Sequence, residues 1–243
     1  MTTAIVYRKE AWYDLVSVWR TPGFVLPALA FPTIFYVFFG VFLNTGSAST
    51  YMLVTYACFG IMGPAMFNFA MTIASDRAHG WLTLKRLSPM PLGAYLLAKL
   101  ITALVFALVI IITLFSIAVL LADVQLLATQ WVLLVLVLLL GTLPFALIGL
   151  ILGLTLSDKA APGVVNLLYL PMAFLSGLWL PITLLPQVLQ HASWIWPSYH
   201  LSQIGLKVIA MDQGHALWLH LLLLIASTSL LGALAVFAFK RLT

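Results

Sequence analysis

The charged side chains best placed for specific chemistry lie in one stretch, Ser75 to Lys99, between two long apolar segments. Its charged residues are Asp76, Arg77, Lys85, Arg86 and Lys99. Between Gly80 and Pro89, apolar residues recur at the spacing of a short amphipathic helix, namely Trp81, Leu82, Leu84 and Leu87. Pro89 and Pro91 end that helix, because proline lacks the backbone N–H that a helix needs. Such a helix between two membrane spans is a docking surface for a soluble partner, and a positively charged loop that only fixes topology explains the residues equally well.

The other residue types that carry chemistry give little support for catalysis or metal binding. Cys58 is the single cysteine and lies in an apolar run, which excludes a disulfide framework and a cysteine metal site. Ser198, Tyr199 and His200 have no acid positioned near them and no nucleophile motif around the serine. The histidines at positions 79, 191, 200, 215 and 220 follow no known ligand spacing, so we expect no catalytic residue and no metal. The sequence also lacks the phosphate loop G-x-x-x-x-G-K-[ST], so any nucleotide that drives this protein must bind to another chain.

The composition is that of a membrane protein with several spans. Of 243 residues, 64% are hydrophobic and 7% are charged, whereas a soluble domain carries about 25% charged residues. The net charge of +5 comes from basic residues at segment ends, which the positive-inside rule explains, so we expect no nucleic-acid partner. The N-terminal stretch contains acids and no apolar core followed by a small-residue cleavage site, so we expect no removed signal peptide.

Six membrane spans of about 20 residues each are predicted from the apolar runs and the polar breaks between them. The expected spans are residues 24–43, 51–74, 100–122, 131–156, 164–180 and 216–239. Residues 3–20 mix apolar and charged residues at helical intervals, which predicts an amphipathic interfacial helix. Residues 181–210 are apolar but interrupted by prolines, which predicts short re-entrant helices on the extracytoplasmic side. The expected fold is therefore an all-α polytopic membrane protein with one transmembrane domain over residues 1–243.

The basic residues orient these spans. With both termini cytoplasmic, ten lysines and arginines lie on the cytoplasmic side and Lys207 alone lies outside. The ten are Arg8, Lys9, Arg20, Arg77, Lys85, Arg86, Lys99, Lys159, Lys240 and Arg241. The charged loop at residues 75–91 then faces the cytosol.

The polar residues inside the expected spans are few, and two interpretations of them stay open. They are Asn68 and Thr72 in the second span and Asn166, Tyr169 and Ser176 in the fifth. Either they line a solute path, or they form hydrogen bonds between helices. Every Asp and Glu lies at a predicted segment end or in a loop, which argues against transport coupled to protons.

Two stretches together resemble the permease subunits of type-two ATP-binding-cassette (ABC) exporters. The first, DRAHGWLTLKRLSPMP at residues 76–91, is similar to the family's cytoplasmic loop, in which a charged cluster precedes a glycine, an amphipathic turn and a proline. The second, FLSGLWLPITLLPQVLQHASWIWPSYHLSQIGLKV at residues 174–208, is similar to the family's Ser-Gly segment with three prolines, here Pro181, Pro186 and Pro197. With the span order, the resemblance covers essentially the whole chain. The sequence departs from the family pattern at Ala78, His79 and Thr83, where the family often has charged residues.

The resemblance implies a half-transporter, in which two permease subunits, identical or different, join two cytosolic ATPase subunits that bind ATP and Mg²⁺. It implies that the ATPase seats on a coupling set, namely Asp76, Arg77, Gly80, Trp81, Leu82, Leu84, Lys85, Arg86, Leu87 and Pro89. In the family the second and fifth spans form the conduit, which implies a solute path of Met66, Asn68, Phe69, Asn166, Tyr169 and Phe174. A path of this composition suits a hydrophobic or amphipathic solute, drug-like or lipid-linked. The expected location is among the lipids of the plasma membrane, the inner membrane of a bacterium.

Two other functions stay open from the residues alone. An intramembrane enzyme would use the outer histidines, His191 and His200, and the isolated chain would be active. A membrane scaffold would have no transport path. The expectation that we carry forward is a transport subunit that is not itself an enzyme and that leaves ATP hydrolysis to a separate chain.

Overall fold

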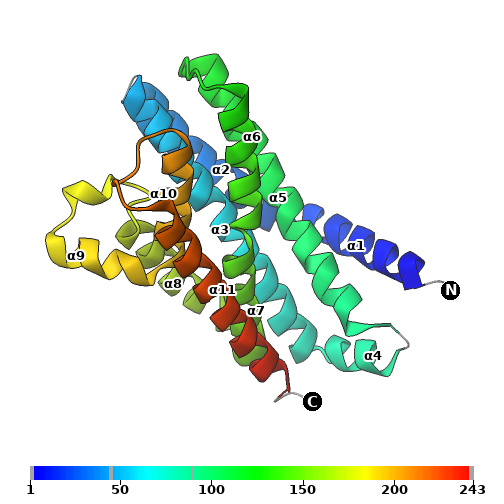
Figure 1. Ribbon diagram of the computed structural model, residues 1–243. Helices are drawn as coiled ribbons and strands as arrows, with labels where there is room; N and C mark the ends of the chain where they lie inside the picture. The colour runs from blue at the N-terminus through cyan, green and yellow to red at the C-terminus, as the bar shows by residue number, and fades with distance from the viewer. Residues whose placement is uncertain (1–2, 44–45, 89, 241–243) are drawn as a thin grey trace.

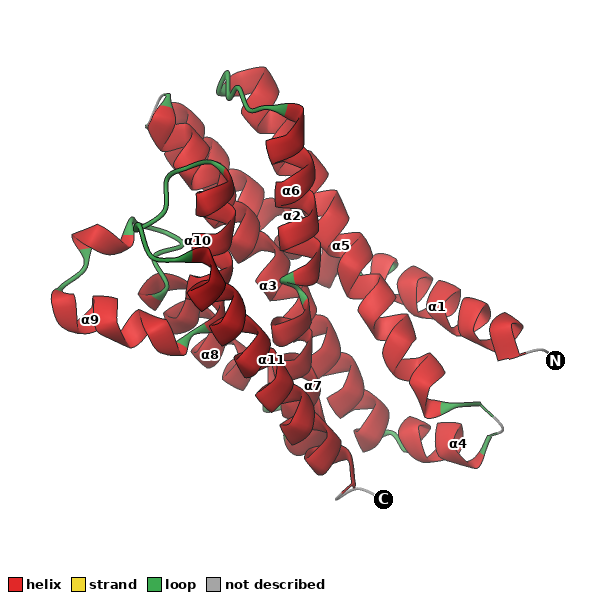
Figure 2. Ribbon diagram, in the orientation of Figure 1, coloured by secondary structure: helices red, strands yellow, loops and turns green. Residues whose placement is uncertain are grey.

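The computed structural model describes residues 3–43, 46–88 and 90–240, and these residues form helices joined by short loops with no strand among them (Figure 2). In chain order the elements are α1 (Thr3–Trp19), α2 (Pro22–Phe35), the π-helix η1 (Tyr36–Phe42), α3 (Ser47–Ala78), α4 (Trp81–Leu87), α5 (Leu92–Leu121), α6 (Ala128–Leu140), α7 (Leu143–Thr155), α8 (Ala161–Leu175), the 3-10 helix η2 (Ile182–Leu184), α9 (Gln187–Ala192), the 3-10 helix η3 (Ser193–Ile195), α10 (Pro197–Val208) and α11 (Leu217–Lys240). The expected all-α class is confirmed. Helices satisfy their backbone polar groups internally, which a bilayer requires.

Five helical segments of the described chain are long and apolar enough to cross a membrane. They are Pro22–Phe42, Ser47–Ala78, Gly93–Leu121, Ala128–Thr155 and Leu217–Lys240. Each overlaps one of the expected spans, so a polytopic helical membrane protein is confirmed. The remaining expected span corresponds to α8, whose 15 residues reach about 22 Å against a hydrocarbon core of about 30 Å. The count of six spans stays a prediction.

The helix α8 also ends earlier than the sequence pattern indicated. The expected span covered residues 164–180, whereas the helix stops at Leu175. The reason is a C-terminal cap built on Gly177, whose φ of 73° is left-handed. The N–H of Gly177 donates to the carbonyl of Phe174, and the N–H of Leu178 donates to the carbonyl of Ala173. These two hydrogen bonds define a Schellman motif, which closes the helix before the apolar run is over.

The long helix α3 is the centre of the bundle, and α7 packs most closely against it. Most side chains of α3 from Leu53 to Ala74 are buried. Two glycines of α7, Gly149 and Gly153, face α3 and have no side chain to hold the helices apart. A Cβ atom built on Gly153 would lie 2.9 Å from the carbonyl oxygen of Phe69. The α3–α7 contact therefore depends on backbone-to-backbone proximity, as in other membrane helix pairs with small residues.

Replacing Gly149 with alanine should destabilise the bundle by about 1–3 kcal/mol. The new Cβ would lie 2.5 Å from the carbonyl oxygen of Met66 and 2.9 Å from the Cβ of Phe69, so the two helices must move apart. Gly232→Ala in α11 is the matched control, since its Cβ meets only Leu147 Cδ1 at 4.0 Å. Thermal unfolding in detergent measures both variants. A Gly149→Ala midpoint equal to that of Gly232→Ala would contradict the close α3–α7 contact.

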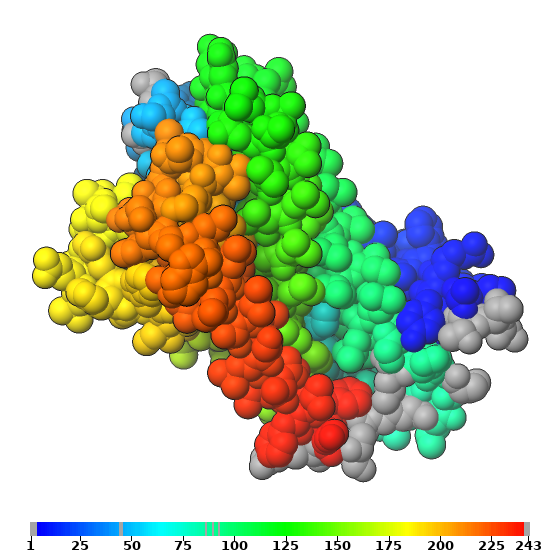
Figure 3. Space-filling model, viewed as in Figure 1, coloured from blue at the N-terminus to red at the C-terminus, as the bar shows by residue number. Residues whose placement is uncertain are grey.

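The bundle has two ends, which organise the loops. The helix α4 and the C-terminal end of α11 lie at one end, and the start of α3 and the α5–α6 connection lie at the other (Figure 1). The helix α1 packs against α5. The helix α11 lies on the surface of the bundle along its length (Figure 3). The basic residues that fixed the expected orientation include Arg241, which lies outside the described residues. The cytoplasmic placement of both termini stays a prediction.

The segment at residues 181–210 is folded as short helices, and its last helix is deeply packed. Every side chain of α10 from Pro197 to Leu206 is buried. This helix contacts α3, α6 and α11. Its depth in the membrane, and with it the re-entrant character, stays a prediction.

Candidate functional site

The short helix α4 is set at an angle to α3 by one glycine. The helix α3 ends at Ala78, and Gly80 follows with a left-handed φ of 74°. Glycine adopts this conformation without the steric cost that a Cβ brings. At the other end, the hydroxyl of Ser88 donates to the carbonyl of Lys85 at 2.7 Å. Of the expected coupling set, Pro89 and the side chain of Arg86 lie outside the described residues.

The two faces of α4 differ in exposure. Leu82 is 5% exposed and packs into the main core. On the other face, Trp81, Leu84 and Leu87 are 56%, 59% and 80% exposed. We call these three residues the apolar stripe of α4. Their spacing of three residues places them along one side of the helix, so α4 presents a large apolar surface at the end of the bundle.

Charged side chains of α1, α3, α4 and α5 form a network, and one end of it joins α4 to α1. Lys85 of α4 forms an ion pair with Glu10 of α1. The Lys85 ammonium also lies over the ring of Tyr95 in α5, 4.5 Å from its centroid, which is a cation–π contact. Lys85 is therefore committed to contacts within the subunit, and so three helices are joined at α4.

The buried end of this network centres on Lys99 of α5. Lys99 is 2% exposed, and its Nζ lies 3.1 Å from Oδ1 of Asp14 in α1. The other carboxylate oxygen of Asp14 accepts a hydrogen bond from Thr102 at 2.7 Å. Asp76, at the end of α3, accepts a 2.6 Å hydrogen bond from Tyr95 and lies 4.0 Å from Lys99. A buried charge is tolerated where it is paired and hydrogen-bonded in this way.

Arg77 is bound to α7. Its Nη1 donates to the carbonyl oxygens of Gly153 at 3.1 Å and Leu156 at 3.2 Å. These carbonyls belong to the C-terminal turn of α7, where helix carbonyls lack internal partners and carry partial negative charge. Arg77 therefore caps α7 in addition to any external role.

Sequence reasoning missed the partners of these cations. Glu10, Asp14, Tyr95 and Thr102 were not among the expected site residues. Their contacts join positions that are up to 88 residues apart in the chain. The available signal was the spacing of Glu10 and Asp14, four residues apart and hence on one face of α1.

The residues of the expected solute path are not gathered at one place. Met66 and Phe69 pack against the glycines of α7 in the core. Asn68 is 3% exposed, and its amide has no hydrogen-bond partner within the described ranges. Phe174 lies next to Trp179, with ring centroids 6.3 Å apart. Asn166 and Tyr169 face a groove that the other four do not line.

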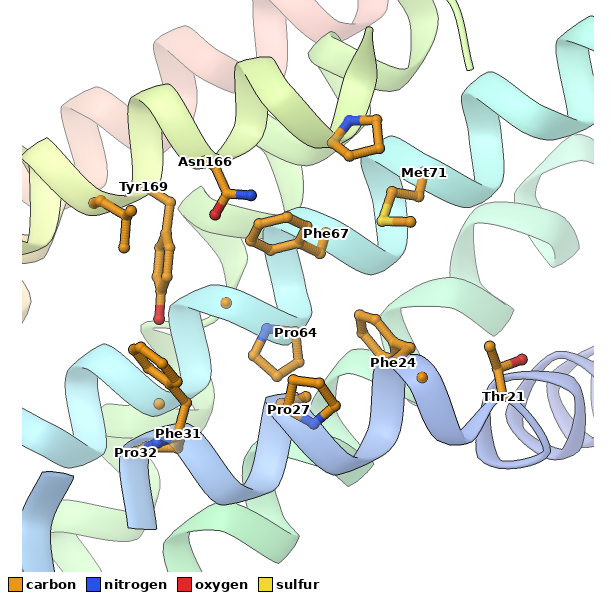
Figure 4. Close-up of a pocket in the computed structure, with 16 residues that line it drawn as sticks. Thr21, Phe24, Pro27, Phe31, Pro32, Pro64, Phe67, Met71, Asn166 and Tyr169 are labelled. Atoms are coloured by element: carbon orange, nitrogen blue, oxygen red, sulfur yellow. The ribbon is translucent and has the colours of Figure 1, made fainter. Parts of the chain in front are cut away.

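This groove lies between α2, α3 and α8 and has a volume of about 520 Å³ (Figure 4). It is lined by Thr21, Gly23, Phe24, Pro27, Ala28, Phe31, Pro32, Gly60, Gly63, Pro64, Phe67, Met71, Pro162, Asn166, Tyr169 and Leu170. Tyr169 donates to the carbonyl of Phe59 at 3.2 Å, and its ring meets Phe67 edge to face at 5.9 Å. The contribution of α2 was not predicted from the sequence. The volume of the groove is in the range of small-molecule binding sites.

Prolines inside helices leave several residues of this apolar groove with carbonyls that lack an α-helical donor. Pro27, Pro32 and Pro64 lie inside helices and line the groove. A proline has no N–H, so the carbonyl four residues before it lacks its α-helical donor. Those carbonyls belong to Gly23, Ala28 and Gly60, which also line the groove. The groove is therefore lined by aromatic rings and by residues whose carbonyls lack an α-helical donor, which suits a ligand with an apolar body and a few donors.

The geometry around Ser198 does not support catalysis by this serine. The hydroxyl of Ser198 is hydrogen-bonded to that of Ser176 at 2.5 Å. His200 is bonded to His220 and to the carbonyl of Trp194. No group of three or more His, Cys, Asp or Glu side chains among the described residues is arranged to hold a metal.

Comparison with known proteins identifies the family. The family model described as "ABC-2 type transporter" matches residues 9–210, a range that runs from α1 through α10 and includes α4 and the groove. The chain belongs to the ABC-2 type transporter family. This ABC-2 permease is also 29% identical over 226 residues to a protein of Bacillus subtilis (strain 168) named "Putative transport permease YvfS". The alignment covers 91% of each chain. The protein is thus a multi-pass membrane subunit of an ABC transporter.

Proposed function

We propose that this ABC-2 permease is the membrane half of an ATP-driven exporter and that α4 docks a separate cytosolic ATPase. The observation that carries the proposal is the apolar stripe of α4, Trp81, Leu84 and Leu87, exposed at one end of the bundle. An exposed apolar patch of this kind marks a protein–protein contact when it lies outside the membrane. The ATPase would bind ATP and Mg²⁺ and perform the hydrolysis. The permease sequence has no phosphate loop with which to bind ATP itself.

The way α4 is held supports transmission of force from such a partner. Lys85 ties α4 to α1, and Tyr95 and Lys99 tie α1, α3 and α5 to one another. The helix α3 continues from Ala78 to the groove, which it lines from Gly60 to Met71. Displacement of α4 by the ATPase would therefore shift α3, and with it the side of the groove that α3 forms.

The groove supports a hydrophobic or amphipathic solute. Its lining is mainly aromatic and aliphatic, and its polar side chains are those of Thr21, Asn166 and Tyr169. No lysine, arginine or acid lies among the residues that line it. A second permease subunit, identical or different, would complete the conduit on the open side of α2 and α8.

Affinity purification of the full chain from its native membrane in mild detergent tests the docking proposal. Mass identification of the bound proteins should recover one soluble ATPase with a phosphate loop. The eluate should hydrolyse ATP only when Mg²⁺ is present. Recovery of the chain alone, with no hydrolysis, would overturn the proposal.

Filling the groove tests the solute path. Ala28→Trp places an indole into a cavity of about 520 Å³ and should lower the apparent affinity for an amphipathic solute by roughly tenfold or more. Leu26→Trp is the matched control, since Leu26 lies on the same helix, is exposed and does not line the groove. The readout is ATPase stimulation of the purified complex by the amphipathic dye rhodamine 6G. No stimulation of the wild-type complex, or equal stimulation of both variants, would contradict the groove as the path.

A further inference from the structure

A buried histidine pair joins α10 to α11, and neither histidine lines the groove. His200 in α10 and His220 in α11 are 2% and 0% exposed, and their Nδ1 atoms are 3.0 Å apart. The rings of Trp194, Tyr199 and His215 surround His220 at centroid distances of 5.7, 5.8 and 6.1 Å. None of these residues belongs to the apolar stripe of α4 or to the groove.

The hydrogen bonds determine which nitrogens of the pair carry protons. Nε2 of His200 lies 2.9 Å from the carbonyl oxygen of Trp194, and a carbonyl only accepts, so this nitrogen carries hydrogen. Neutral His200 then has an unprotonated Nδ1, which accepts the hydrogen bond that Nδ1–H of His220 donates. Neutral His220 is left with its lone pair on Nε2. That atom is buried and has no hydrogen-bond partner among the residues described.

We propose that Nε2 of His220 is a proton-binding site and that its occupation releases α10 from α11. A proton at this atom creates a buried cation whose new N–H has no acceptor in the surrounding cluster. A proton on Nδ1 of His200 would instead place two N–H groups opposite each other across 3.0 Å. In both cases the closed contact is stable only while both rings are neutral.

The neighbouring charges do not compensate such a cation. Lys207 of α10 adds positive charge near His220, and Asp212 adds negative charge. The carboxylate of Asp212 is already engaged, since it accepts hydrogen bonds from Lys207 at 2.7 Å and from the N–H of Gly214 at 3.0 Å. The remaining titratable neighbours whose rings meet that of His220 are Tyr199 and His215, and positive charge on His215 would disfavour a cation at His220. The helix α7, packed on α11, has no titratable side chain.

The direction of the pH effect follows from burial. Burial lowers the pKa of His200 below its ordinary value, and the hydrogen bond to the Trp194 carbonyl offsets only part of that effect. In the released state an exposed histidine regains a pKa of about 6.5. Because both rings are buried, the closed contact is fully stable above about pH 6.5, where a released histidine is also neutral, and it weakens progressively as the pH falls below that value. Since α10 also contacts α3, acid on this side of the membrane would loosen the helix that lines the groove.

Hydrogen–deuterium exchange of the full chain in lipid nanodiscs tests the proposal. After correction for intrinsic rates, α10 of the wild type should exchange roughly tenfold faster at pH 5.5 than at pH 7.5, since uptake of one proton shifts an equilibrium by up to tenfold per pH unit. His220→Gln should abolish that difference. His191→Gln, at an exposed position of α9, should leave it unchanged. Equal corrected exchange of wild-type α10 at both pH values, or a wild-type difference in His220→Gln, would overturn the proposal.

A measurement on the wild type alone covers the case in which His220→Gln does not fold. Nitrogen-15 NMR of histidine-labelled protein distinguishes protonated from unprotonated imidazole nitrogens. At pH 7.5 the Nε2 of His220 should be unprotonated and that of His200 protonated. The Nε2 of His220 should gain its proton together with the faster exchange of α10. An Nε2 of His220 that is already protonated at pH 7.5 would overturn the assignment.

Discussion

Leu84→Glu should weaken binding of the cytosolic ATPase at least about tenfold while the permease stays folded. Leu84 is 59% exposed, so the permease core loses little when it is replaced. Burial of a leucine in an interface contributes about 1.5–3 kcal/mol, and a glutamate adds the cost of removing a charge from water. The amount of ATPase co-purified per permease and the ATP turnover of the eluate measure the effect.

Val188→Glu is the matched control for this experiment. Val188 lies on α9, is 77% exposed and is remote from α4, so the same charge is added elsewhere (Figure 1). Binding should be unchanged in Val188→Glu. Full ATPase recovery with Leu84→Glu, or the same loss with Val188→Glu, would contradict docking on the apolar stripe. Arg77 is unsuitable for this test, because its removal would also uncap α7.

Asp14→Ala should destabilise the permease by about 3–5 kcal/mol. The substitution leaves the ammonium of Lys99, which is 2% exposed, with Asp76 at 4.0 Å as its remaining acid. It also removes the acceptor of the Thr102 hydroxyl. The midpoint of thermal unfolding in detergent should fall, and α1 should become accessible to protease before the rest of the chain.

Two further variants separate a buried pair from a general loss of charge. The double variant Asp14→Leu, Lys99→Met should be less destabilised than Asp14→Ala, because no unpaired charge stays buried. Asp212→Ala breaks the more exposed Lys207–Asp212 pair and should cost about 1 kcal/mol or less. The single variants Asp14→Leu and Lys99→Met are measured alongside. A double variant whose loss of stability equals the sum of the two single losses would contradict the pairing of Asp14 with Lys99.

The local features of the chain were the predictable ones. Trp81, Leu82, Leu84 and Leu87 follow the period of a helix, and α4 lies at those residues. The apolar runs predicted the membrane helices, because hydropathy is a sum over consecutive residues. The end of α8 was missed, because the left-handed conformation of Gly177 stops a helix inside a continuous apolar run.

The contacts of the polar residues were not predictable in the same way. Lys85 was expected to face the ATPase, and the structure pairs it with Glu10 across 75 residues of sequence. The groove likewise joins α2 to residues of α3 and α8, and only Asn166 and Tyr169 were expected there. Each of these contacts depends on how distant helices pack.

By itself, the sequence determined that this protein is a helical membrane protein with a short amphipathic helix between two spans, and its resemblance to a known family indicated a permease. Composition, hydropathy and helical period are properties of neighbouring residues, so no tertiary information was needed. Only the tertiary structure decided that Asp14 and Lys99 form a buried pair, that prolines of two helices line one groove, and that His200 meets His220. The physical reason is that the partner of a buried polar group is set by which helix faces meet, and the same local pattern permits many such arrangements.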